Sequence, residues 1–169
     1  MGRANRDSDE IEALYRQHGA ALFLFATTMS GDRGSAQDAV HQVFLKLIEN
    51  GSLSRAVDKK AYLFACVRHA VLDDSEFRRR NTSFEVDSVQ FSPQDRDYYG
   101  EQNLRHALNM LPDDQRVVVV LRVWGELTFS QIATLLGISL NTAASRYRYA
   151  LTKLRESMTK EDSCANSRG

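Results

Sequence analysis

The sequence predicts an all-α protein built from two small helical domains joined by a linker, the C-terminal one containing a helix-turn-helix. Apolar residues recur at helical spacing in both halves of the chain, and the polar stretch 81–100 between them shows no such period. The segment from Thr128 to Leu154 predicts two helices joined by a tight glycine turn. The run Val117–Val120 favours a strand by composition, but a lone strand among helices has no pairing partner, so a helix is predicted there as well.

Residues 8–80 predict a bundle of three helices. The first begins at the capping-box spacing of Asp7 and Glu10 and ends at the break 30–32. The second runs from Ser35 to the Asn50-Gly51 stop, and after a polar loop, residues 51–58, the third covers 59–79. The residues expected to face inward are Ile11, Leu14, Tyr15, His18, Leu22 and Phe25 in the first helix, Ala36, Val40, Val43, Phe44 and Leu47 in the second, and Leu63, Cys66, Val67, Ala70 and Phe77 in the third.

The C-terminal domain is expected at residues 101–158. A helix resumes near Glu101 with Leu104, Ala107, Leu108 and Leu111 inward, and Pro112 stands at the first turn of a helix over 113–124. Residues 159–169 predict a disordered tail. The sequence leaves open whether the two domains close on each other, since the acidic linker could cover the basic C-terminal face or stay extended.

The helix-turn-helix carries its own local signals. Thr128 and Gln131 have capping-box spacing, Gly137 supplies the positive φ of a sharp exit, and Ser139 can cap the following helix. In that second helix Ala143, Tyr147, Ala150, Leu151 and Leu154 face inward, which leaves Asn141, Ser145, Arg148 and Tyr149 outside with Ala144 and Arg146 on the flanks. A recognition helix needs such a small, polar and cationic face, although an ordinary helical hairpin with a solvated basic face has the same pattern.

Composition excludes several classes of protein. The 169 residues are 43% hydrophobic and 26% charged, and neither a membrane-spanning apolar run nor a signal peptide is present, so a cytoplasmic globular protein with free thiols at Cys66 and Cys164 is expected. The net charge is zero, yet residues 115–155 hold six bases against Glu126 alone. The positive charge is therefore concentrated where the helix-turn-helix lies.

Nothing in the sequence points to catalysis. The histidines at 18, 41, 69 and 106 lack metal-ligand spacing, and no glycine-rich phosphate loop is present. His69 and Asp73 lie one helical turn apart, a spacing typical of a surface contact. No catalytic residue, metal or cofactor is predicted.

The chain resembles the extracytoplasmic-function group of bacterial sigma factors, the two-domain specificity subunits of RNA polymerase. The segments LYRQHGAALFLFA, GDRGSAQDAVHQVFLKL and AYLFACVRHAVLD resemble the second conserved region of that family. ALNMLPDDQRVVVVLRVWGELTFSQIATLLGIS and the helix after it resemble the fourth. The resemblance implies a non-catalytic initiation factor that binds core RNA polymerase, through its β′ and β subunits, and promoter DNA. An anti-sigma inhibitor is a common further partner in the family.

The resemblance assigns the surface of the second helix to polymerase. Leu45 falls opposite the inward stripe and is expected to be an exposed apolar residue in a charged ring, which is typical of a partner surface. Family members grip a coiled coil of β′ with this surface, which places Asp38, Gln42, Leu45 and Lys46 there. A single stray surface leucine is the alternative.

Family members also capture an extruded base of the −10 element with the loop between the second and third helices. Single-stranded DNA is bound by aromatic platforms beside cations. The candidates here are Arg55, Lys59, Lys60, Tyr62, Phe64, Arg68 and His69, and each aromatic among them also suits a place in the core. The chain departs from the family pattern at Tyr62, Ala65 and His69, and Asp74 and Glu76 stand where positive charge is usual.

The second helix of the motif would lie in the major groove of the −35 element. The candidates for base edges are Asn141, Thr142, Ala144, Ser145 and Arg148, and those for phosphates are Arg146 and Arg122. The rival interpretation is a helix-turn-helix regulator that acts without polymerase, for which the C-terminal half alone would suffice. A regulator of this kind would have no need for an exposed Leu45, and it would bind paired half-sites as a dimer.

Overall fold

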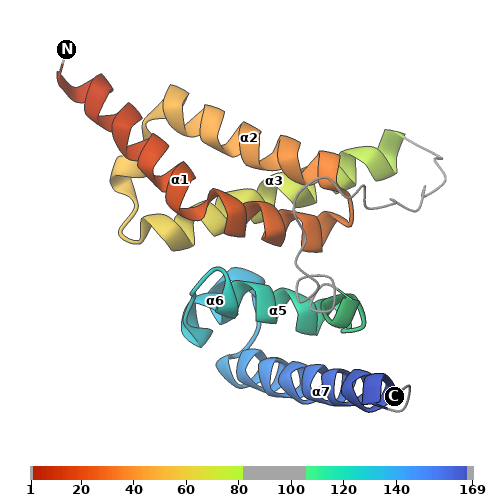
Figure 1. The fold of residues 1–169 in the computed structure, drawn as a ribbon. Coiled ribbons are helices and arrows are strands. Elements are labelled where there is room, and N and C mark those ends of the chain that lie inside the picture. The colour runs from red at the N-terminus through yellow and green to blue at the C-terminus, as the bar shows by residue number, and fades with distance from the viewer. Residues whose placement is uncertain (1, 82–105, 167–169) are drawn as a thin grey trace.

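The computed structural model describes residues 2–81 and 106–166, and every regular element within those ranges is helical. In chain order these are α1 (Gly2–Ser30), α2 (Arg33–Asn50), the 3-10 turn η1 (Ser52–Arg55), α3 (Lys59–Asn81), α5 (Asp113–Val123), α6 (Phe129–Leu136) and α7 (Leu140–Asn166), as Figure 1 shows. The all-α prediction with a C-terminal helix-turn-helix is confirmed. Residues 82–100 of the expected linker lie outside the described residues.

In the N-terminal bundle, α1 and α2 end where the sequence predicted. Gly31 and Gly51 both adopt positive φ, where a glycine has no Cβ to strain, and they end α1 and α2. The inward stripe predicted for α2 is buried throughout. Phe77 differs from its prediction, since it is 65% exposed. The last turns of α3, to which Phe77 belongs, extend past the junction between α1 and α2 (Figure 1).

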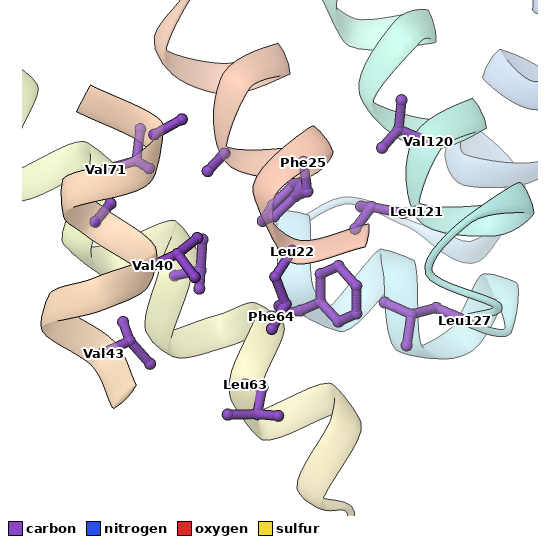
Figure 2. Packing of buried hydrophobic residues seen from close by; sticks show 14 of the residues in the cluster. Leu22, Phe25, Val40, Val43, Leu63, Phe64, Val71, Val120, Leu121 and Leu127 are labelled. Carbon is purple, nitrogen blue, oxygen red and sulfur yellow. The ribbon is translucent and has the colours of Figure 1, made fainter. Parts of the chain in front are cut away.

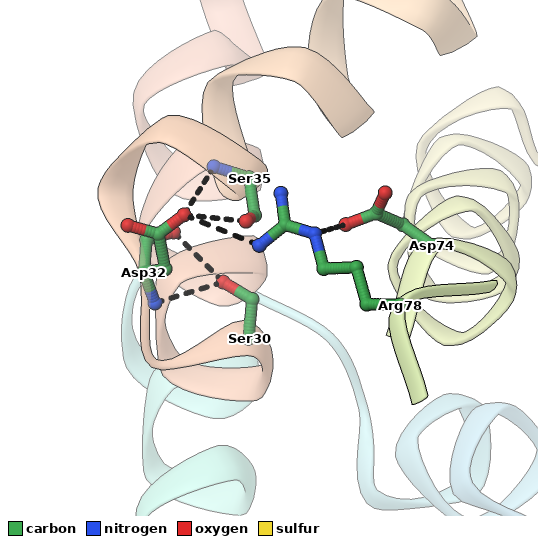
Figure 3. A network of polar contacts seen from close by, with 5 residues as sticks. All are labelled: Ser30, Asp32, Ser35, Asp74 and Arg78. Carbon is green, nitrogen blue, oxygen red and sulfur yellow. Dashed lines mark hydrogen bonds and ion pairs between the residues drawn. The ribbon is translucent and has the colours of Figure 1, made fainter. Parts of the chain in front are cut away.

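A carboxylate organises the junction of α1 and α2 (Figure 3). Asp32 is the N-cap of α2: its Oδ2 accepts from the backbone N of Ser35 at 2.7 Å and also from the Ser35 hydroxyl. Arg78, held by Asp74 at 3.1 Å, reaches the same oxygen at 3.8 Å from α3. The Ser35 hydrogen bonds, with a smaller contribution from Arg78, lower the pKa of Asp32. The Asp32 side chain thus links the start of α2 to the end of α3, while the Ser30 hydroxyl at the end of α1 donates to the Asp32 backbone carbonyl at 2.9 Å.

The C-terminal half is fixed by a half-buried arginine. The guanidinium of Arg116 donates to the carbonyls of Leu108 at 2.8 Å, Asn109 at 3.0 Å and Leu111 at 2.8 Å, which satisfies the end of the helical stretch before α5. Pro112 is the N-cap of α5, one position before the predicted first turn. Leu108, Leu111, Val119 and Ala150 form a small core of this half.

The helix-turn-helix has the predicted local geometry. Thr128 and Gln131 form a reciprocal capping box, and Gly137 ends α6 with φ of 67°. The hydroxyl of Ser139 accepts from the backbone N of Thr142 at 3.0 Å, as expected of the next cap. Two details differ: Leu151 is exposed, and α7 continues as helix to Asn166, past the residue 158 at which the sequence predicted a tail.

The two halves pack against each other through one continuous core. α1 contacts α5, and α3 contacts α6. Phe64 of α3 is fully buried among side chains of both halves, with Leu22 and Phe25 of α1 on one side and Leu127 on the other (Figure 2). The question that the sequence left open therefore has an answer: the halves are closed on each other.

The Asp32 cap makes a measurable contribution to stability. Asp32→Ala should lower the free energy of unfolding by about 1 kcal/mol at neutral pH, measured by urea denaturation. Because the folded pKa lies below the ordinary 3.8, the charged cap stabilises the fold above pH 3.8 and loses this contribution as pH falls through the folded value. Asp32→Ser is the control, since serine caps without a charge. Equal stability of the parent and the alanine variant would refute this role.

Candidate nucleic-acid interface

The candidate base-reading residues lie together on one side of α7. Asn141 and Arg148 are exposed, and Thr142, Ala144 and Ser145 are half-buried beside them. Arg148 Nη2 donates to the hydroxyl of Ser145 at 3.3 Å, which aligns the guanidinium along the helix. Small side chains near the start of α7 with a cation one turn later match the shape that close approach to a groove requires.

The two candidate phosphate ligands have protein partners instead. Arg122 Nη1 donates to the carbonyl of Leu127 at 2.9 Å, and its guanidinium lies 5.0 Å from the centre of the Phe129 ring. Arg146 Nε lies 3.1 Å from a carboxylate oxygen of Asp114. The excess of positive charge in this half is thus smaller than residues 115–155 alone suggest, because acidic residues such as Asp114 lie just before that range and offset it.

The candidate cations for the −10 strand lie at the start of α3. Arg55 is exposed, whereas Lys59 pairs with Glu10 of α1. Lys60 Nζ donates to the backbone carbonyl of Glu126, in the loop between α5 and α6, at 3.0 Å. Burial, followed by the charge of Lys60, lowers the pKa of the adjacent His18. Two of these lysines therefore hold other parts of the chain in this conformation.

The two candidate aromatic platforms differ in their surroundings. Tyr62 is half-buried against the core. Phe64 is a core residue, with its ring 5.5 Å from that of Phe25 at an interplanar angle of 62°. A base cannot stack on Phe64 here, so that assignment does not hold for the closed chain. Burial also raises the pKa of the Cys66 thiol, which keeps it protonated and a poor nucleophile.

Arg68 and His69 line a cavity of about 360 Å³ between α3 and α6. The opposite wall includes Ser130, Thr134 and Leu135 of α6. Arg68 Nε is buried without a hydrogen-bond partner. The candidate −10 face of α3 is thus turned toward the C-terminal half.

The surface of α2 is open. Leu45 is 58% exposed, and Asp38, Gln42 and Lys46 around it are exposed as well. No group of three or more potential metal ligands occurs among the described residues, and none of the helices described is long and apolar enough to cross a membrane.

Comparison with known proteins resolves the family. The model of Sigma-70 region 2 matches residues 14–83, and that of Sigma-70, region 4 matches residues 101–154. The chain belongs to the extracytoplasmic-function sigma factors. It is 29% identical to the ECF RNA polymerase sigma factor SigL of Mycobacterium tuberculosis over 162 residues, which cover 91% of this chain and 92% of SigL. The RNA polymerase sigma-E factor of Streptomyces coelicolor is 28% identical over 159 residues, 90% of this chain and 88% of that factor.

Solved structures agree with this sigma-factor fold. RpoE from Bartonella quintana, in complex with the anti-sigma factor NepR, superposes with a TM-score of 0.70 at 26% identity, covering 89% of this chain and 97% of that one. CnrH in complex with the cytosolic domain of CnrY gives a TM-score of 0.58 at 21% identity, covering 93% and 92%. The second likeness shows the fold alone.

Sequence reasoning missed one residue on the open face of this sigma factor. Ile48, one helical turn after Leu45, is also 58% exposed and widens the apolar patch on α2. The signal was available, since residues three apart on a helix share a face.

The acids of this sigma factor at positions 74 and 76 have specific partners. Asp74 pairs with Arg78, and Glu76 pairs with Arg80 at 2.6 Å. These pairs offset charge in the arginine run that ends α3. The local field that a phosphate strand would meet is therefore weaker than the run of bases alone suggests.

Proposed function

We propose that this chain is a cytoplasmic, non-catalytic initiation factor that binds core RNA polymerase and directs promoter-specific transcription. In this proposal α7 reads the −35 element, while the 51–58 loop and the start of α3 bind the −10 strand. α2 contacts the β′ subunit, and the C-terminal half contacts the β subunit. The main support is that one chain combines a capped helix-turn-helix, with an exposed polar face on α7, and a separate exposed apolar patch on α2.

That combination argues against a regulator that acts without polymerase. Such a protein needs the helix-turn-helix but has no use for Leu45 and Ile48 in water, where exposed apolar side chains favour association. An anti-sigma factor is proposed as a further partner, because RpoE of Bartonella quintana, to which this chain is similar, forms a complex with one.

Run-off transcription tests the proposal. Core polymerase with and without the chain is given fragments of the source genome, and transcripts are mapped to their start points. Transcripts with common upstream elements that require the chain are expected. If no fragment gives a transcript that depends on the chain, the proposed function is wrong.

The −35 assignment predicts a sequence-dependent defect. On a promoter with its own −35 element, Arg148→Ala should weaken initiation by an amount equivalent to about 1 to 3 kcal/mol of recognition free energy, because a base contact is lost. On a promoter with a mutated −35 element the loss should be smaller. Lys153→Ala, which removes an exposed cation further along α7, is the matched control and should affect both promoters alike. An equal loss for Arg148→Ala on both promoters would contradict base reading.

The polymerase assignment predicts a binding defect without unfolding. Leu45→Asp should abolish co-purification with core polymerase while leaving the helical circular dichroism unchanged, because Leu45 is exposed and its replacement disturbs no core. Leu72→Asp is the matched control: this leucine on α3 is 40% exposed and lies outside the proposed surface. Undiminished co-purification of the Leu45 variant would exclude this surface.

A further inference from the structure

The cavity between α3 and α6 has two walls of different character. On the α3 side its lining residues recur at helical spacing, so one face of this helix and its N-cap supplies the whole wall. The residues of this wall are Asp58, Ala61, Ala65, Arg68 and His69. The opposite wall includes Leu127 and, from α6, Ser130 and Leu135. At about 360 Å³ the cavity has the size of a small-molecule site.

Small side chains leave the middle of this cavity empty. Ala61 and Ala65 lie one helical turn apart on α3, and both are half-buried. An alanine side chain ends at Cβ, so a longer side chain at either position would extend into the space. Leu127 and Leu135 line the same space from the other side. A compact body bound there would therefore meet apolar surface on both walls.

The end of the wall at Arg68 carries an unsatisfied positive group. Arg68 Nε is buried and has no hydrogen-bond partner, and no carboxylate within residues 2–81 and 106–166 forms an ion pair with this guanidinium. A buried donor without an acceptor costs free energy, which an acceptor at that place would recover. His69, the next residue, lines the cavity as well and has a ring nitrogen that can donate. The group that suits this end is an anion.

The carboxylate in the same lining is engaged and distant. Asp58 Oδ1 accepts from the backbone N of Ala61 at 3.0 Å, and its Oδ2 accepts from Nε2 of Gln131. Asp58 and Arg68 are separated by about 15 Å along the helix, at about 1.5 Å per residue. This separation exceeds the screening length of about 8 to 10 Å at physiological ionic strength. Asp58 therefore does not prevent an anion from binding at Arg68.

We propose that this cavity binds a small amphipathic organic anion, with a carboxylate or a phosphate ester attached to a compact apolar body. The anionic group accepts hydrogen bonds from Arg68 and His69. The apolar body lies between the two alanines of α3 and the leucines of the opposite wall. An inorganic anion would use only the charged end of the site, and a neutral molecule only its apolar walls.

Four related probes test charge and shape on the free, full-length chain. The anions 2-naphthoate and 2-naphthyl phosphate carry a carboxylate and a phosphate ester on the same body. The neutral 2-naphthamide has the body without the charge, and inorganic phosphate has the charge without the body. Titration calorimetry at constant ionic strength should show saturable binding at one site for a naphthyl anion. The amide and inorganic phosphate should bind about tenfold more weakly or worse.

The two naphthyl anions distinguish the sources of the ligand. Tighter binding of 2-naphthoate supports a carboxylic acid as the natural ligand, and tighter binding of 2-naphthyl phosphate supports a phosphate ester. The proposal is overturned if neither anion saturates a site, or if 2-naphthamide binds as tightly as the anions.

Two substitutions test whether the probe occupies this cavity. Arg68→Met keeps the aliphatic stem but removes the charge and the donor, and Ala65→Leu fills the space but keeps the charge. Each should weaken binding of the preferred anion by about tenfold or more. Arg155→Met removes an exposed cation of α7 outside the lining, and this matched control should bind like the parent. Undiminished binding by Arg68→Met, or an equal loss in Arg155→Met, would contradict the site.

A nuclear magnetic resonance signal reports on the arginine even if Ala65→Leu fails to fold. The Nε–H resonance of Arg68, assigned by its loss in Arg68→Met, should shift on addition of the preferred anion, because Nε gains an acceptor. The Nε–H of Arg116 already donates to the carbonyl of Leu108 and should stay in place. An unchanged Arg68 resonance at saturation would overturn the proposal. These measurements use neither polymerase nor DNA, so their outcome is independent of the proposed function.

Discussion

The burial of Phe64 between the two halves is the contact on which the whole arrangement depends. Its ring meets Phe25 within the N-terminal bundle and faces Leu127 from the other half (Figure 2). Burying an aromatic side chain of this size is worth about 2 to 3 kcal/mol. The polar contacts near it are partly exposed and individually weaker. Apolar burial thus drives closure, and the hydrogen bonds fix its geometry.

The same contact explains why the candidate surfaces differ in accessibility. α2 lies on the side of the bundle away from α5 and α6 (Figure 1), and its exposed residues are unaffected by closure. α7 lies on the far side of α5 from the N-terminal bundle (Figure 1), and Asn141 and Arg148 on it are exposed. Among the three candidate surfaces, the one on α3 faces the opposite half. The burial of Phe64 therefore covers the candidate −10 surface and leaves the candidate surfaces of α2 and α7 exposed.

Most of the local structure could be predicted from the sequence because its causes are local. The Thr128–Gln131 capping box and the glycine at 137 depend on neighbours within a few positions. The exposure of Leu45 follows from its place opposite a buried stripe. Periodicity could not decide whether Phe64 was core or platform, because one side of its ring is covered by Leu127 from the other half of the chain. The partners of Arg146 and Asp58, far away in sequence, were unpredictable for the same reason.

A core that is shared between two halves also couples their folding. In the closed chain neither half can unfold without exposing Phe64 or Leu127, so the free protein should melt in one cooperative transition. An excised N-terminal bundle would present a bare aromatic face to water and would tend to self-associate. Proteolytic sensitivity and thermal stability of the intact chain therefore become indirect measures of how often its halves are apart.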